Sequence, residues 1–299
     1  MFNSTTSTPR DVGALIRSLW DFNDRAASET RFRDALKTLG ADDALEVETQ
    51  IARTFSLRRN FATAHQLLDD IERRMTPSSR PALRVRYLLE RGRTFNSAKQ
   101  FDTAKPLFQQ AYDIAKEEPA LIGLAIDAAH MFGFSRDKDE ALRWTELGMK
   151  LALGSEQPDA IGWRPGLANN LGSTERERGN LDASMKHFQV ALKEHLARSK
   201  PLQIRIAYWQ VANVHRLQGK IDDAMAIQLR LEKESDDAKS PDLYIYSELA
   251  ELFAAQGAKR NAENAKRYAG LALAIAEKDA WMVENEAALI ARMKALQRN

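Results

Sequence analysis

The sequence contains no cysteine, few prolines and glycines, and no long apolar run. The absence of cysteine excludes disulfide bonds and thiolate metal sites and fits a reducing compartment, so we expect a cytoplasmic protein. No apolar stretch approaches the roughly 18–20 residues that cross a bilayer, so we expect no membrane contact. The first residues show no basic region followed by an apolar run, so no secretory signal is visible.

Neither sign of charge predominates, because the chain has 44 basic and 42 acidic residues and a formal net charge of +2. This balance argues against a dedicated binder of polyanions. Apolar residues make up 44% of the chain and charged residues 29%, which is typical of a folded protein. The chain has 299 residues, so it forms either two domains or one elongated array.

Motifs of catalysis are missing as well. There is no glycine-rich phosphate loop, no cysteine nucleophile and no HExxH pair. The five histidines are scattered along the chain, and the acidic pairs lack the spacing of a calcium loop. We therefore predict a protein that is not an enzyme and that has no metal site and no cofactor.

What the sequence does contain is a repeat of about 40 residues. A small residue recurs at steps of 40, 37, 43, 40 and 38 positions, at Ala52, Gly92, Ala129, Gly172, Ala212 and Ala250. A second small residue follows twelve positions later at Ala64, Ala104, Ala141, Ser184 and Ala224, and the last unit places it at Ala265 after a three-residue insertion. Helices that cross closely need Ala or Gly at the contact, so the spacing predicts a series of helix pairs.

Most prolines and several glycines fall at the boundaries that the same repeat predicts. Eight of the nine prolines fall at predicted joints or helix starts, where the missing N–H costs little: Pro9, Pro77, Pro81, Pro119, Pro158, Pro165, Pro201 and Pro241. Gly179, Gly219 and Gly257 fall where the two helices of a pair must turn. Because no segment alternates with period two, we expect no strands.

The residues around the small positions resemble the tetratricopeptide repeat. Phe55, Phe95, Phe132 and Phe253 each lie three residues after the small residue, and segments 88–111 and 171–191 match the repeat most closely. The period near 40 resembles the long variety of this repeat, found in kinesin light chains and in bacterial quorum-peptide receptors. The resemblance implies an all-α, right-handed superhelical solenoid of about six to seven helix-turn-helix repeats.

Four segments follow from this assignment. We expect a disordered N-terminus at 1–8, an N-terminal helix pair at 9–40, six repeats at 44–275 and one C-terminal capping helix at 279–298. The pair at 9–40 is either a degenerate repeat or a cap. The last helix suits a cap because a solenoid must cover its final apolar face. An irregular bundle of alanine-rich helices is the alternative architecture.

The resemblance also implies which residues face the concave groove. Carried over by register, the groove residues are Arg53, Arg93, His130, Asn169, Arg176, Trp209, Asn213 and Arg216. Asparagine can pair with both the donor and the acceptor of a peptide backbone, arginine can grip a carboxylate, and tryptophan can act as an apolar anchor. Lysine is missing from these positions, which argues against the C-terminal carboxylate clamp of some family members.

Together these features predict a non-catalytic scaffold or adaptor that binds a protein or peptide in the groove. One alternative is a regulatory receptor in which a small peptide or metabolite changes the shape of the superhelix. Another is nucleic-acid binding through residues 53–99, which hold 11 basic and 4 acidic residues. Those arginines are spread around the helix without an aromatic stacking platform, which argues against nucleic acid. Nothing in the spacing demands a homo-oligomer.

Overall fold

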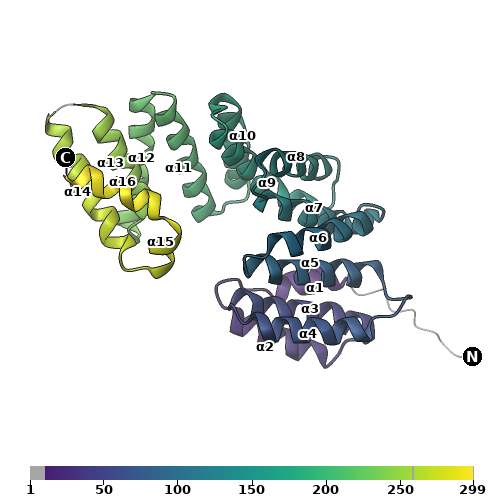
Figure 1. Ribbon diagram of the computed structural model, residues 1–299. Helices are drawn as coiled ribbons and strands as arrows, with labels where there is room; N and C mark the ends of the chain where they lie inside the picture. The colour runs from purple at the N-terminus through teal and green to yellow at the C-terminus, as the bar shows by residue number, and fades with distance from the viewer. Residues whose placement is uncertain (1–10, 258, 299) are drawn as a thin grey trace, which may run out of the picture. The chain divides into compact units, whose positions relative to one another are not determined.

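A computed structural model describes residues 11–257 and 259–298, and within these ranges the chain is entirely helical (Figure 1). The predicted disordered segment 1–8 lies outside the described residues. Sixteen α-helices and two short 3-10 helices follow one another, and no strand occurs in the described ranges. The predicted all-α class is therefore confirmed. Among the described residues, no helix combines the length and the apolar character that crossing a membrane requires.

Twelve of the helices form six consecutive pairs. The first helices of the pairs are α3 (Ala41–Leu57), α5 (Pro81–Ser97), α7 (Ile122–Met131), α9 (Pro158–Glu177), α11 (Pro201–Leu217) and α13 (Leu243–Ala255). The second helices are α4 (Phe61–Arg74), α6 (Phe101–Ala115), α8 (Lys138–Leu153), α10 (Leu181–Ala197), α12 (Ile221–Asp237) and α14 (Lys259–Ala276). The 3-10 helices η1 (Pro119–Leu121) and η2 (Phe132–Phe134) flank α7.

The remaining helices lie at the two ends of the chain: α1 (Val12–Leu19), α2 (Arg25–Leu36), α15 (Ala280–Asn285) and α16 (Ala287–Arg298). At the N-terminal end, Val12 and Ile16 of α1 pack with Phe32 of α2 against α3. At the C-terminal end the chain has two helices where one was expected. The break falls at Glu286, whose carboxylate accepts a hydrogen bond of 2.9 Å from the Tyr244 hydroxyl. Helix α16 packs on α13 and α14 and buries Met293 there.

The chain divides into two compact units, residues up to Trp163 (unit 1) and residues from Arg164 onward (unit 2). The boundary lies inside α9. The expectation that Pro165 marks a joint or a helix start is wrong, because the helix begins at Pro158 and Pro165 lies in its interior. Gly162 and Gly166 flank this proline, and a side chain added at either glycine would meet no neighbouring atom within 4 Å. Pro165 itself is buried, and it lies next to the division between the units.

Small residues lie where the two helices of a pair touch. Ala52, Ala129, Ala212 and Ala250 are completely buried. At Gly92 even a methyl group would be too large, since a Cβ atom there would lie 2.5 Å from the ring of Phe108. Gly172 has the same relation to Phe188, at 2.7 Å. The spacing of small residues thus reports a real close approach of the helix backbones.

In five of the six pairs the turn between the two helices uses a left-handed backbone conformation. Gly179, Gly219 and Gly257 have φ angles of 81°, 76° and 67°. Arg59 and Lys99 occupy the same turn position in two pairs of unit 1, with φ angles of 62° and 65°. Only glycine adopts this conformation without a steric penalty, so these two turns of unit 1 carry a local cost that glycine avoids at the same position in unit 2.

Candidate binding site

The first helices of unit 1 surround a continuous space, which we call the unit 1 hollow. Three overlapping cavities of about 400, 420 and 370 Å³ lie along it. Arg17, Pro158 and Asp159 line the first two cavities, and Arg53, Asp127 and Trp163 line the last two. Helices α1, α3, α5 and α7 and the first turns of α9 contribute side chains. A cavity of a few hundred Å³ is large enough for a small ligand or for the side chain of a partner.

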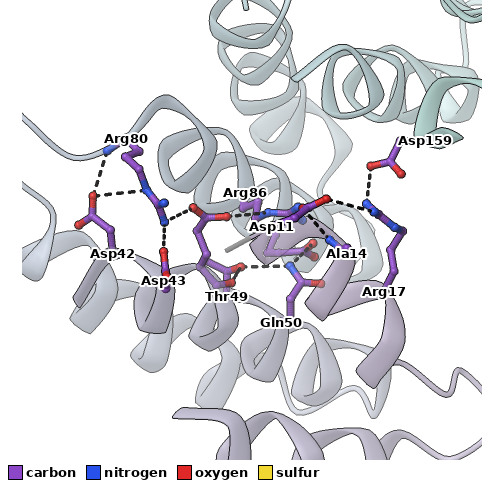
Figure 2. Close-up of polar contacts among 12 residues, drawn as sticks. Asp11, Ala14, Arg17, Asp42, Asp43, Thr49, Gln50, Arg80, Arg86 and Asp159 are labelled. Atoms are coloured by element: carbon purple, nitrogen blue, oxygen red, sulfur yellow. Dashed lines mark hydrogen bonds and ion pairs between the residues drawn. The ribbon is translucent and has the colours of Figure 1, made fainter. Parts of the chain in front are cut away.

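One end of the unit 1 hollow is a network of paired charges (Figure 2). Glu46 is almost fully buried and accepts hydrogen bonds from Arg80 at 2.8 Å and Arg86 at 3.2 Å. Burial raises the pKa of Glu46, although Arg86 and Arg80 act in the opposite direction. Figure 2 also shows Arg17 on α1 pairing with Asp159 on α9. These charges already satisfy one another.

Arg93, predicted for the groove, lies in the middle of the hollow. It pairs with Asp127 on α7 and donates a hydrogen bond of 2.7 Å to Glu90. Burial lowers the pKa of Arg93, but Asp127 and Glu90 outweigh it, so the net shift is upward. Gln50 on α3 also donates to Glu90, at 3.3 Å. Arg93 therefore links successive first helices.

Arg53 is less well compensated than Arg93. Its Nη1 atom lies 3.5 Å from Glu90 Oε1, which Arg93 already holds at 2.7 Å. The Nε atom of Arg53 is buried and has no hydrogen-bond partner in the described part of the chain. Its guanidinium carbon lies 5.5 Å from the ring centre of Trp20 and 5.3 Å from that of Phe22. Burial, followed by the nearby charge of Arg93, lowers the pKa of Arg53.

The other end of the hollow is aromatic. The His130 ring centre lies 5.5 Å from that of Phe134 and 5.1 Å from that of Trp163. Phe134 is 57% exposed, which is unusual for so large an apolar side chain. Burial lowers the pKa of His130 and leaves the imidazole neutral at pH 7. Arg53 and Asn96 line the same cavity as this aromatic wall.

In unit 2, three of the predicted groove residues bond to each other and to Glu248. Arg176 donates to Gln210 and to Asn213, both at 2.8 Å. Asn213 in turn donates to Glu248 at 2.6 Å, and Arg216 donates to the same carboxylate at 2.8 and 3.0 Å. The chain of bonds runs from α9 through α11 to α13. It positions successive first helices, as Arg93 does in unit 1.

Trp209 stands apart from this chain and lines an apolar pocket of about 390 Å³. Its indole N–H donates to the Tyr244 carbonyl at 2.9 Å, which fixes the ring between α11 and α13. Leu202 and Ile206 on α11 line the same pocket and are 52% and 45% exposed. We call this the Trp209 pocket. The structure does not place Asn169 on its lining, and the Asn169 side chain has no partner within the described ranges.

The structure reveals one set of residues that sequence reasoning missed. Two positions before each small residue, every pair carries a polar side chain: Gln50, Glu90, Asp127, Asn170, Gln210 and Glu248. Five of the six are buried. The signal was available in the sequence, since an unbroken polar column beside an apolar one is unusual for buried positions. We call this column the polar row.

The basic segment 53–99 is largely paired. Carboxylates lie within ion-pair distance of Arg53, Arg58, Arg73, Arg74, Arg80, Arg86, Arg91 and Arg93. The guanidinium of Arg84 donates to backbone carbonyls of the preceding loop. Arginines held in this way are poorly placed to meet a phosphate backbone.

No protein-family model matches the sequence, and none of the curated proteins is similar enough to it to count as a relative. Solved structures do resemble the fold. A tetratricopeptide repeat protein from Parabacteroides merdae is 16% identical over 96% of this chain and 99% of that one, with a TM-score of 0.55. The apo form of RapI is 11% identical over 90% and 75% of the two chains, with a TM-score of 0.67.

NprR, solved in complex with its cognate peptide NprX, is 14% identical over 97% of this chain and 85% of that chain, with a TM-score of 0.56. The chain has a tetratricopeptide-repeat fold. At these identities the likeness concerns the fold alone, and it confirms the resemblance that the repeat spacing indicated. A tetratricopeptide-repeat fold by itself names no ligand, so function must be argued from the hollow and the pocket.

Proposed function

We propose that this protein is a non-catalytic adaptor that binds a peptide or a segment of a partner protein on the first helices of unit 2. The Trp209 pocket receives an apolar side chain of that segment. The observation that carries the proposal is the exposure of Leu202 and Ile206 beside a fixed indole ring. Aromatic and aliphatic groups in a concave, partly desolvated site are typical anchors of binding energy.

The polar residues at the pocket support an extended peptide. Arg205 lines the pocket and has no hydrogen-bond or ion-pair partner among the described residues, so it is free to meet a carbonyl or a carboxylate. Asp242 is engaged differently, because its carboxylate caps α13 by accepting from the Tyr244 and Ile245 amides. A segment lying on the pocket thus finds an apolar anchor and one cation. The fold likeness to NprR, whose structure contains a bound peptide, is consistent with this use of the fold.

The predicted groove residues take a supporting part in this proposal. Arg176, Asn213 and Arg216 bond to the polar row and hold α9, α11 and α13 in register. Their side chains shape the wall against which the segment lies. The side chains that contact the bound segment directly are Trp209, Leu202 and Ile206.

The test is to pan a random 12-residue peptide library on the immobilised full chain and to measure the affinity of enriched peptides by fluorescence anisotropy. We expect enriched peptides to share an apolar residue. Ile206→Asp should weaken their binding at least tenfold, because it puts a charge in the pocket. Leu229→Asp is the matched control, since Leu229 on α12 is 42% exposed and does not line the pocket.

Both variants change an exposed side chain, so both should keep the wild-type melting temperature. The proposal fails if no peptide is enriched. It also fails if Ile206→Asp binds the enriched peptides as tightly as Leu229→Asp does.

A further inference from the structure

The aromatic end of the unit 1 hollow forms a second, chemically different site. We propose that it binds a small aromatic carboxylic acid, whose carboxylate meets Arg53 and whose ring lies against Phe134 and Trp163. This site belongs to unit 1 and does not depend on the peptide proposal for unit 2. Its cavity measures about 370 Å³.

The charges around Arg53 favour an anionic ligand. Two arginines, Arg53 and Arg93, face two carboxylates, Glu90 and Asp127. Arg93 forms the short contacts with both acids, so Arg53 keeps a single ion pair at 3.5 Å and a buried Nε atom without a partner in the described residues. A guanidinium in this state gains from a carboxylate, which it can bind through two parallel hydrogen bonds.

Neutral donors lie beside Arg53 in the same cavity. Ser56 on α3 and Asn96 on α5 line it, and neither side chain has a hydrogen-bond partner within residues 11–257 and 259–298. Ser56 is only 4% exposed. Hydroxyl and amide donors next to a guanidinium complete the set that a carboxylate accepts from.

Aromatic side chains that line the same cavity indicate that the acid is aromatic. Phe134, His130 and Trp163 form a connected group of rings, and Phe134 leaves more than half of its surface uncovered at 57%. A flat ligand ring can stack against or meet these rings edge-on. Because burial keeps His130 neutral, this wall adds no second cation.

The carboxylate of Asp127 disfavours a ligand with more than one negative charge. Asp127 lines the cavity and stays ionised, since Arg93 and Arg53 outweigh the effect of burial and lower its pKa. Because Arg53 is incompletely compensated and lies near the ionised Asp127, the cavity suits a ligand with a single negative charge. A phosphate dianion would place its second charge next to Asp127, which costs electrostatic energy.

The experiment compares 2-naphthylacetate with 2-naphthylacetamide, which has the same shape without the charge. Binding of each to the full chain is measured by isothermal titration calorimetry, with acetate as the probe that lacks the ring. We expect the acid to bind about tenfold or more tightly than the amide, and acetate to show no measurable binding. Equal affinity of the acid and the amide, or no binding of the acid, overturns the proposal.

Variants assign the effect to this cavity. Arg53→Met should remove the preference for the acid over the amide, whereas Arg59→Met, which changes an exposed arginine in the turn after the same helix, should keep it. Phe134→Ala should weaken both ligands several-fold because it removes part of the ring wall. If Arg53→Met lowers the melting temperature strongly, Arg53→Lys keeps the charge without the two-pronged geometry and should reduce the preference. An unchanged preference in the folded variant places the ligand elsewhere and overturns the assignment.

Discussion

At the scale of single residues, the interior charges of unit 1 depend on one another. Arg93 contacts Glu90 and Asp127, and all three side chains are at most 12% exposed. Removing the arginine leaves two buried carboxylates without their main counter-charge. A buried charge without a partner is far more costly than the loss of a surface pair.

We therefore expect Arg93→Met to lower the free energy of unfolding by about 3–5 kcal/mol in urea denaturation. Arg33→Met is the control, because Arg33 is 55% exposed and pairs with Glu29 within one helix. It should cost less than about 1 kcal/mol. Similar losses for the two variants would mean that the interior network contributes little.

His130 links stability to pH. Burial, with Arg93 and Arg53 adding to it, lowers the pKa of this imidazole despite the opposing charge of Asp127. In the unfolded chain the imidazole takes up a proton near pH 6.5, whereas in the folded chain it resists protonation. The unfolded state therefore binds more protons below that pH, and the stability of the fold decreases as the pH falls.

The expected result is that His130→Gln loses less stability than the wild type between pH 7.5 and pH 5.5. Urea denaturation at the two pH values measures the difference. His65 and His195, whose pKa values burial also lowers, keep part of the slope in both proteins. A variant with the same slope as the wild type contradicts the role given to His130.

At the scale of helices, close packing at Gly92 can be tested by a double-mutant cycle. An added methyl group would overlap the ring of Phe108, so Gly92→Ala should destabilise the fold by about 1–3 kcal/mol. The better helix propensity of alanine offsets up to about 1 kcal/mol of this cost. In the Phe108→Leu background the added cost should largely vanish. A purely additive cycle, measured by chemical denaturation, would show that the two residues do not compete for space.

The turns of unit 1 allow a stabilising change. Arg59 has a positive φ, so Arg59→Gly should raise the free energy of unfolding by about 0.5–1 kcal/mol after the entropy cost of glycine is subtracted. Arg136 is at the same position of the α7–α8 pair but is not among the residues with positive φ. Arg136→Gly should lower stability by about 0.5–1 kcal/mol. A melting series that gives both changes the same sign would contradict this account of the turns.

The helix pairs could be predicted because small residues and turn glycines act locally. Gly172 is required by its contact with Phe188 in the second helix of the same pair, so its spacing is visible in the sequence. Pro165 misled the prediction because a proline inside a helix depends on the room left by neighbours. At the break, Glu286 accepts a hydrogen bond from Tyr244, more than 40 residues away in sequence, and local patterns do not report such a contact.

The candidate site was harder to predict for the same reason. Register placed Arg93 and Asn213 on the right helices, but it did not show that each is already bonded to the polar row. Those bonds join neighbouring repeats and depend on how the pairs stack. The predicted assignment of these residues to ligand binding stays a prediction.

At the scale of the whole molecule, the two units carry walls of different chemistry. Unit 1 has a hollow rich in paired charges, with Arg53 only partly compensated. Unit 2 has a smaller apolar pocket beside Trp209. One chain can in this way hold a partner segment with unit 2 and a small acid with unit 1. The two proposals fail separately, since each uses its own probe and its own variants.

The most direct measurement is methyl NMR of the full chain with labelled isoleucine, leucine and valine, during titration with a library-selected peptide. We expect the methyl signals of Leu202, Ile206 and Ile245 to shift, because these residues line the Trp209 pocket. The methyl signals of Leu229 on α12 and Val190 on α10, both exposed on second helices, should stay in place. Shifts confined to the second helices would contradict the claim that the first helices of unit 2 hold the partner.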